Sequence, residues 1–511
     1  MATGSPADLI VGLDSSTTAT KAIAWTPQGE AVAEGRSRLP LDTPAPGRFE
    51  QSAASWWDAA CAALQQVAQQ VEPARIVALA IANQRETFVP LDAEGTPLRP
   101  AIVWVDERCR ADVATLAEAV GRETIHRLSG KPPDMTPVCY RLAWMRRAEP
   151  ELYRQIGMVA DVQTYLVRQL TGHFRTSAAS ADPLGLYDMD AGGWSTTILS
   201  ALELDTSQTP EARVSGTVLG HLTPNAAAAT GLAAGTPVVA GGGDGQAAGL
   251  GVNALRAERA YLNLGTATVS GIYSADYRAD TAWRTMGSMT GHGCYLETCL
   301  RTGTFLIDWF VTHVCGIDPT KTPGIYSQLE AQASELPIGA DGLLLVPYWS
   351  GVMSPHWNLD ARGAIVGLGP THTRGHIYRA LMEGVALEQA LATHAVEQQA
   401  NMELKEYVAI GGGAQSDLWC RMVAAASGKR VLRSATVEAS SLGAAMAAAV
   451  GAGIYNSVEE AATQMEGRIV STFDPEPEWA GRYGELLALY RQVYPQLTHI
   501  YDGLARFAEG T

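Results

Sequence analysis

The chain has 511 residues, more than one hydrophobic core usually supports, which predicts two domains with room for a third. Hydrophobic residues make up 47% of it, and its formal net charge of -16 disfavours nucleic acid or an anionic membrane as the main partner. No stretch reaches the roughly twenty uninterrupted apolar residues of a membrane helix, and the N-terminus lacks a signal-peptide pattern. We therefore expect a cytoplasmic globular protein with reduced, scattered cysteines.

An acid and a run of hydroxyl residues separate the first two predicted strands. An apolar strand over 9–13 leads into DSSTTATK, which begins at Asp14, and a second strand follows over 22–25. The backbone N–H groups and hydroxyls of such a turn could cup a phosphate, although an ordinary hairpin is the commoner meaning of the pattern. Asp14 is of the type that holds water on Mg²⁺, and Thr17 and Thr18 would face the phosphates.

Polar side chains follow two further predicted strands. A buried strand over 76–82, preceded by a helix over 55–71, runs directly into Arg85 and Glu86. Adjacent Arg and Glu residues can form a surface ion pair or can bind the hydroxyls of a polyol, and a site that pairs each hydroxyl rejects molecules lacking it. A short strand over 101–105 carries Trp104, which local context alone places in the core.

One carboxylate stands among glycines and alanines in TPVVAGGGDGQAAGLG, residues 236–251. A strand over 236–240 would place Asp244 just past its carboxyl end, where open α/β sheets bind their ligands. The glycines would let a substrate and another backbone approach the carboxylate. Asp244 is therefore a candidate general base, with a plain strand-to-helix turn as the alternative.

The second half of the chain repeats the first motif. A strand, turn and strand over 261–273, with Gly265 and Thr266 in the turn, echo the hairpin at Asp14. This weak repeat predicts two domains of related topology that each give one turn to the same phosphate chain. A strand over 406–410 then leads into GGGAQSDLW, and a glycine-rich turn before a helix is an anion or nucleotide seat. The G-x-G-x-x-G and G-x-x-x-x-G-K-[ST] patterns are absent from these turns, which disfavours NAD and a P-loop.

In this order the motifs resemble those of the FGGY carbohydrate kinases, from about Leu9 to Leu497. The most specific match is GAIVGLGPTHTRGHIYRALMEGVALEQ, which fits the family's second signature. The resemblance implies an α/β fold of two actin/Hsp70-like (ribonuclease H-like) ATPase domains with a cleft between them. Residues 1–252 would bind the sugar and supply the base, and residues 253–511 would bind the nucleotide.

The resemblance also implies roles for the candidate residues. Asp244 would be the catalytic base, Arg85, Glu86 and Trp104 would bind the sugar together with it, and Asp14 and Asp244 would hold Mg²⁺. The residues assigned to ATP are Ser16, Thr17, Thr18, Lys21, Gly265, Thr266, Gly412, Gly413 and Ala414. Two positions depart from the family pattern: Ser16 stands where glycine is usual, and Arg141 where the first signature usually has lysine.

The implied reaction is transfer of the γ-phosphate of ATP to a terminal hydroxyl of a ketopentose, D-xylulose first. NQRETF and AIVWVDER resemble the glycerol kinases of the family, whereas SGVMSPHWNLDARGAIVGL and GGGAQSDLW resemble its xylulokinases. A glycerol or tetritol kinase is therefore one rival. The other is a non-enzymatic actin/Hsp70-like ATPase switch, which would need neither Asp244 nor the polar residues Arg85 and Glu86. The expected partners are a sugar or polyol and ATP, and the sequence is compatible with a homodimer without fixing the oligomeric state.

Overall fold

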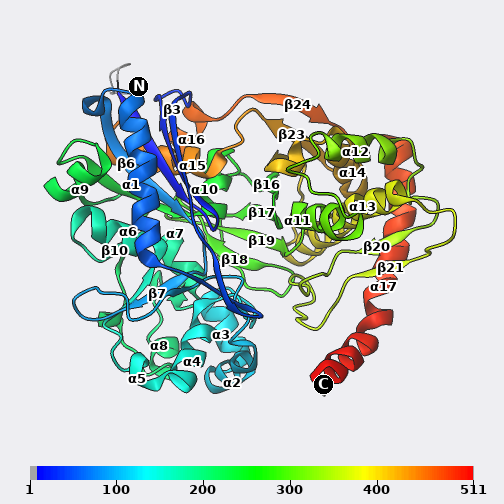
Figure 1. The fold of residues 1–511 in the computed structure, drawn as a ribbon, viewed down its shortest axis with the longest axis horizontal. Coiled ribbons are helices and arrows are strands. Elements are labelled where there is room, and N and C mark those ends of the chain that lie inside the picture. Colours follow the sequence, from blue (N-terminus) through cyan, green and yellow to red (C-terminus); the bar gives the residue numbers. More distant parts are fainter. Residues whose placement is uncertain (1–7, 510–511) are drawn as a thin grey trace.

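The computed structural model describes residues 8–509 as two α/β halves, each built around a mixed β-sheet (Figure 1). The blue to green part of the chain makes up the left half of the view, and most of the yellow to red part makes up the right half. The long helix α17, Pro477–Glu509, ends the chain at the outer edge of the second half.

The first sheet has six strands in the order β14–β15–β6–β1–β2–β3. β1 pairs antiparallel with β2 and β2 with β3, whereas β1, β6 and β15 run parallel. β1 is apolar throughout most of its length because protein covers both faces of the sheet. The strands are β1, Leu9–Ser15; β2, Ala19–Trp25; β3, Ala31–Arg38; β6, Ile76–Asn83; β14, Val218–His221; and β15, Pro237–Gly243.

The second sheet repeats this arrangement in the order β18–β19–β17–β16–β22–β23–β24. Here β16, β17 and β19 are antiparallel neighbours, and β16, β22 and β23 run parallel as β1, β6 and β15 do. The related topology predicted from the two hairpins is therefore confirmed. The strands are β16, Arg259–Leu264; β17, Thr268–Ser274; β18, Arg284–Gly287; β19, Cys294–Leu300; β22, Glu406–Ile410; β23, Arg430–Ser434; and β24, Ile469–Phe473.

Helices cover the sheets. In the first half, α1 packs in the core on one face and α15 in the core on the other, and in the second half α13 packs against α14. The helix predicted over 55–71 is confirmed as α1. The main helices are α1, Ala53–Gln70; α4, Val138–Ala148; α6, Val162–Thr171; α10, Asp244–Gly251; α13, Arg374–Ala400; α14, Asp417–Ser427; α15, Ala439–Gly451; and α16, Val458–Met465.

A small sheet, β4–β5–β8–β7–β9, and short helices extend the first half. The strand predicted over 101–105 is shorter than expected, because the chain turns where the Val103 carbonyl accepts a hydrogen bond from the Asp106 N–H (3.0 Å). Trp104 lies in this turn. The elements are β4, Asp42–Ala45; β5, Arg48–Gln51; β7, Phe88–Leu91; β8, Ala101–Ile102; β9, Met158–Asp161; α2, Arg110–Val120; α3, Arg122–Ser129; and α5, Pro150–Tyr153. Within residues 8–509, no helix has the length and apolar character needed to cross a membrane.

α15 comes from the second half of the sequence but packs on the first sheet. Its backbone approaches positions that have no room for a side chain. A Cβ on Gly12 of β1 would lie 1.9 Å from the Ser441 carbonyl oxygen, and a Cβ on Gly443 would lie 1.8 Å from the Ala247 carbonyl oxygen. A domain boundary after residue 252 remains our proposal. In the structure, however, the core of the first half includes α15, which comes later in the sequence.

Glu388 of α13 is a buried carboxyl group among tyrosines. The Tyr348 hydroxyl donates a hydrogen bond to Oε2 (2.9 Å), as does that of Tyr490, whereas Oε1 is buried without a hydrogen-bond partner from residues 8–509. Burial raises the pKa of Glu388 to about 7. Because the folded protein holds the proton more tightly than the unfolded chain, this group's contribution to stability is complete at acidic pH and is lost as the pH rises to about 7.

We expect Glu388→Gln to stabilise the fold above pH 7, because the amide is never ionised. Urea unfolding should give the variant about 1–3 kcal/mol more free energy of unfolding than the wild type at pH 8, and a difference under about 0.5 kcal/mol at pH 4. Glu335→Gln, at an exposed residue, is the matched control and should change neither value. A variant that is less stable than the wild type at pH 8 would contradict this account.

Candidate active site

Three parallel strands of the first sheet end at the same level. In the register of β1 with β6, Ser15 lies opposite Asn83, and in the register of β15 with β6, Gly243 lies opposite the same Asn83. The residues next to these positions therefore meet at one edge, which brings Asp14 and Asp244 together. This is the carboxyl edge, where open α/β sheets bind ligands.

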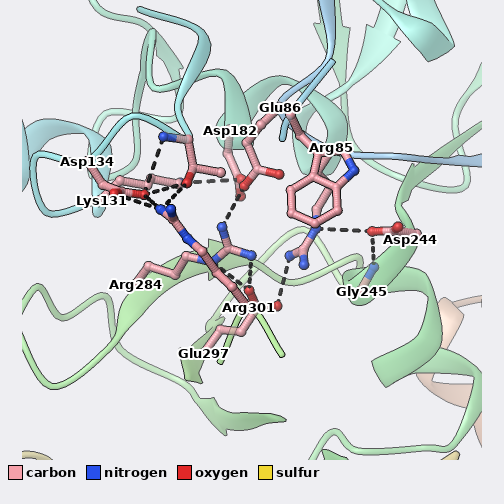
Figure 2. A network of polar contacts seen from close by, with 12 residues as sticks. Arg85, Glu86, Lys131, Asp134, Asp182, Asp244, Gly245, Arg284, Glu297 and Arg301 are labelled. Atoms are coloured by element: carbon pink, nitrogen blue, oxygen red, sulfur yellow. Dashed lines mark hydrogen bonds and ion pairs between the residues drawn. The ribbon is translucent and has the colours of Figure 1, made fainter. Parts of the chain in front are cut away.

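Asp244 is the first residue of α10, and 37% of its side chain is exposed. Its Oδ1 accepts a hydrogen bond from the Gly245 N–H (2.7 Å) and lies 3.1 Å from Arg85 Nε, as Figure 2 shows. Within residues 8–509, no hydrogen bond reaches Oδ2. Burial raises the pKa of Asp244, and the Arg85 guanidinium opposes that rise. One oxygen of the carboxylate is thus held and the other is open.

The glycines around Asp244 make room for Arg85. A Cβ on Gly243 would lie 2.5 Å from Arg85 Cγ, and a Cβ on Gly245 would lie 2.8 Å from Arg85 Cζ. We expected these glycines to admit a substrate and another backbone. In the structure an arginine side chain fills that space and is brought onto the carboxylate.

Arg85 and Glu86 follow β6, are 8% and 5% exposed, and are paired with residues of the second half. Arg85 Nη1 donates to Glu297 Oε2 (2.8 Å), and Arg284 Nη1 donates to Glu86 Oε1 (2.8 Å) (Figure 2). Arg284 also donates from Nε to Glu297 Oε1 (2.7 Å). These partners lie on β18 and β19, so both halves build one polar wall, which we define as Arg85, Glu86, Arg284 and Glu297.

Open polar atoms remain beside this wall. Three polar atoms make no hydrogen bond within residues 8–509: the donor Arg85 Nη2 and the acceptors Glu86 Oε2 and Asp244 Oδ2. An alcohol hydroxyl donates one hydrogen bond and accepts others, so it can satisfy either kind of atom. The arrangement therefore suits a molecule with several hydroxyl groups.

Two more buried ion pairs continue the polar wall. Lys131 Nζ lies 3.3 Å from Asp182, and Arg301 Nη2 lies 2.8 Å from Asp134 (Figure 2). Sequence reasoning did not identify these residues, nor Arg284 and Glu297. The available signal was a charged residue inside an apolar strand, as in CYLETCL around Glu297.

Trp104 connects the polar wall to the first hairpin, because its indole Nε1 donates to Thr17 Oγ1 (2.9 Å). Arg141 of α4 is fully buried and supports the same region from behind. It donates to the backbone carbonyls of Glu86 (2.8 Å), Thr136 (2.9 Å) and Trp104 (2.6 Å). The departure from lysine at this position thus supplies a planar group with several donors, which one ammonium cannot reproduce.

We expect Arg141→Lys to raise KM for the acceptor about tenfold, because the loss of one or two of these hydrogen bonds releases the backbone that carries Glu86 and Trp104. Steady-state kinetics with the acceptor varied at saturating ATP would measure the change. Arg147→Lys is the matched control on the same helix, since Arg147 is largely exposed and, within residues 8–509, pairs only with Asp112. An unchanged KM in both variants would rule out this role of Arg141.

The first hairpin accommodates Ser16 without strain. The Ser16 hydroxyl donates to the Ala19 carbonyl oxygen (2.9 Å) and closes the turn between β1 and β2. Thr18 is exposed, whereas the Thr17 hydroxyl already binds Trp104. Lys21 Nζ lies 2.6 Å from the Glu438 carboxylate, so a phosphate would have to compete with that ion pair. The assignment of these residues to ATP remains a proposal.

The two turns assigned to the nucleotide in the second half lie at one edge. Gly265 and Thr266 connect β16 to β17, and the 3₁₀ turn η5, Gly412–Gln415, follows β22, the parallel neighbour of β16. Thr266 and Gly412 are exposed. Ala414 is only 1% exposed as a whole residue and packs in the core of the second half.

Asp14 has a buried oxygen without a partner: no hydrogen bond within residues 8–509 reaches its Oδ1. Burial raises the pKa of Asp14 to about 7, and the negative charge of Asp244 adds to the rise. In the described part of the chain, no group of three or more His, Cys, Asp or Glu side chains is arranged to hold a metal ion. Mg²⁺ commonly uses one or two carboxylates together with water and substrate phosphates, so Asp14 and Asp244 fit an ion that arrives with a nucleotide.

We expect Asp14→Asn to abolish transfer without destabilising the fold. The amide removes a buried charge whose oxygen lacks a partner, so the thermal unfolding temperature without nucleotide should equal or exceed that of the wild type. Turnover should fall at least about 100-fold, because charge neutralisation by the metal is a main part of phosphoryl transfer. Asp161→Asn is the matched control. Asp161 is also buried, but its side chain caps α6 by accepting a hydrogen bond from the Thr164 N–H and has no proposed role in the reaction, so activity should persist. An active Asp14→Asn variant would contradict the assignment.

The structure also holds a charged cavity of about 430 Å³, at the other edge of the second sheet. It lies beside the first residues of three parallel strands, Arg259, Glu406 and Arg430. Arg259 pairs with Glu406 (2.8 Å), and Arg430 pairs with Asp474 (3.0 Å). No predicted site residue lines this cavity, and we assign it no function.

Two family models match the chain in succession. Residues 9–251 match the N-terminal domain of the FGGY family of carbohydrate kinases, and residues 260–452 match the C-terminal domain. The chain belongs to the FGGY family of carbohydrate kinases. It is therefore a phosphotransferase with an alcohol group as acceptor, as predicted, and the non-enzymatic ATPase switch is set aside.

Relatives and solved structures extend the similarity over nearly the whole FGGY chain. Xylulose kinase of Escherichia coli K12 is 30% identical over 492 residues, which cover 96% of this chain and 99% of the relative. Autoinducer-2 kinase of Yersinia enterocolitica is 28% identical over 519 residues, with coverage of 97% and 96%. The crystal structure of xylulose kinase from Rhodospirillum rubrum has a TM-score of 0.87 at 28% identity, with coverage of 97% and 100%. The predicted two-domain α/β fold is confirmed, whereas the different names of the relatives leave the acceptor open.

Proposed function

We propose that this FGGY kinase transfers the γ-phosphate of ATP to a terminal hydroxyl of a ketopentose, with D-xylulose as the first acceptor. The observation that carries the proposal is that Asp244 Oδ2, Arg85 Nη2 and Glu86 Oε2 have no hydrogen bond within the described part of the chain. A hydroxyl placed there could give its proton to the carboxylate while neighbouring hydroxyls bind the other two atoms. The similarity to xylulose kinases supports D-xylulose as the first acceptor.

The proposed step moves one proton and one phosphoryl group. Asp244 Oδ2 takes the proton of the acceptor hydroxyl as its oxygen forms a bond to the γ-phosphorus. The bond from that phosphorus to the β–γ bridging oxygen breaks, and ADP leaves with the electron pair. Positioned general-base help of this kind contributes roughly 10²- to 10⁴-fold to the rate.

ATP and Mg²⁺ are the proposed co-substrate and metal ion. Asp14 and Asp244 would hold the ion, whose chemistry is to neutralise charge on the transferring group. The first hairpin, with Ser16, Thr17, Thr18 and Lys21, would face the phosphates. The turns at Gly265 and Thr266 and at Gly412–Ala414 would face the remainder of the nucleotide.

The charges of the polar wall favour a neutral acceptor over a sugar acid. Arg85 is already paired with Glu297 and Asp244, and Arg284 with Glu86 and Glu297. A carboxylate on the acceptor would meet the negative charge of Asp244 and Glu86 without a free cation in this wall to offset it. D-gluconate is therefore a suitable negative control.

A coupled assay of ADP release with a panel of acceptors tests the proposal. We expect D-xylulose to raise the rate at least about tenfold over the rate without acceptor, and D-gluconate to have no effect. Stimulation by glycerol or erythritol instead would favour the rival glycerol or tetritol kinase, whose support is the Arg85, Glu86 and Trp104 set. No stimulation by any neutral acceptor would overturn the proposal.

Asp244→Asn tests the base independently of the acceptor's identity. We expect kcat to fall about 10²- to 10⁴-fold with the acceptor that gives the fastest turnover, because the amide cannot take the proton. ADP affinity without Mg²⁺, measured by calorimetry, should change less than about threefold, since the residues assigned to the nucleotide lie in the two hairpins and in η5. Retained turnover would show that another group takes the proton.

A further inference from the structure

Glu297 is a buried charge that no part of the proposed reaction uses directly. It lies in β19, has no exposed surface, and comes from the second half of the chain. Its Oε1 accepts from Arg284 Nε, and its Oε2 accepts from Arg85 Nη1 (2.8 Å) and from the Tyr261 hydroxyl. Burial alone would raise the pKa of Glu297, but Arg85 and Arg284 hold it at about 2, so the group is an anion.

Arg85 is shared between two carboxylates of unequal access. Nη1 points to the buried Glu297, whereas Nε lies 3.1 Å from the half-open Asp244 (Figure 2). Arginine and carboxylate groups commonly form bidentate pairs with two parallel N–H···O bonds. Such a pair between Arg85 and Asp244 would use Nε and Nη2 and would occupy both oxygens of Asp244, but within residues 8–509 Nη2 makes no hydrogen bond to Asp244. The bond from Nη1 to Glu297 opposes the rotation of the guanidinium that would bring Nη2 onto Oδ2.

We propose that Glu297 is a positioning residue for the catalytic base. By holding Nη1 of Arg85, it restricts that guanidinium to Oδ1 of Asp244 and keeps Oδ2 open to the acceptor hydroxyl. This inference rests on the proposed function of Asp244 as the base. Glu297 lies on β19 of the second half and Asp244 on α10 of the first half. A residue of the second half therefore keeps the base of the first half accessible to the acceptor.

The arrangement also explains why Arg284 is present. Within residues 8–509, removing Arg284 would leave Glu86 without an ion pair and Glu297 paired with Arg85 alone, and an uncompensated buried charge is costly. Arg284 allows Glu297 to remain ionised while it binds Arg85. Its guanidinium thus supports the position of Arg85 through an intermediate carboxylate.

The test begins with Glu297→Gln, which keeps the shape of the side chain and removes its charge. We expect kcat to fall about 10- to 100-fold as Arg85 turns fully onto Asp244, with KM for ATP changed less than twofold. The acceptor is the fastest one of the panel. Hydrolysis of ATP without acceptor, in which water replaces the hydroxyl, provides a second rate that should fall in parallel.

A charge-balanced double variant separates positioning from a loss of folding. Arg85→Met with Glu297→Gln removes one cation and one anion. If Glu297 acts through Arg85, kcat of the double variant should be less than about threefold below kcat of Arg85→Met alone. The proposal would be overturned if the fold-decreases in kcat of the two single variants multiply in the double variant. Urea unfolding of each variant corrects the rates for the folded fraction.

Glu388→Gln is the matched control, since Glu388 is another buried glutamate of the second half and shares no hydrogen bond with the polar wall. It should leave kcat and KM unchanged. If Asp244→Asn is inactive and Glu297→Gln keeps wild-type kcat, only the positioning role fails. If Asp244→Asn keeps its activity, the proposed base fails, and both inferences fall with it.

Discussion

One arginine between two carboxylates organises the candidate site. Arg85 extends from the end of β6 to Asp244 in the same half of the molecule and to Glu297 in the other half. Both pairs are removed from most solvent, where charges interact more strongly than at a surface. The glycines at 243 and 245, the left-handed backbone of Glu86 at a φ of 51° and the presence of Arg284 are all consistent with accommodating this one guanidinium.

Much of this site follows from local sequence. An apolar strand that ends in a glycine-rich turn with one acid predicts a carboxylate at the carboxyl edge of a sheet, and Asp244 lies there. The same reasoning places Asp14 and Arg85, because β1 and β6 are recognisable strands and parallel neighbours end together. The repeated hairpin likewise predicted the common topology of the two sheets.

The partners of these residues could not be predicted in the same way. Glu297 and Arg284 are more than 195 positions from Arg85 and Glu86 along the chain, and their pairing depends on how the halves meet. A charged residue inside an apolar strand indicates a buried ion pair but does not identify its partner. The strand predicted over 101–105 was too long for a related reason. A hydrogen bond to the Val103 carbonyl holds the chain in a turn, and the apolar character of Val103 does not reveal it. Ala414, which the resemblance assigns to the nucleotide, is buried in the core, and its assignment remains a proposal.

The packing of α15 has a consequence for how the molecule is made. The first sheet is buried on one side by a helix that begins at residue 439, and the absence of a side chain at Gly12 lets the backbones of β1 and α15 touch. During synthesis from the N-terminus, that side of the sheet must wait for nearly two hundred further residues before it is covered. A fragment that ends after residue 252 would expose the apolar surface of β1, β6 and β15 to water, and such surfaces aggregate. The first half therefore completes its fold only after α15 of the second half has been synthesised.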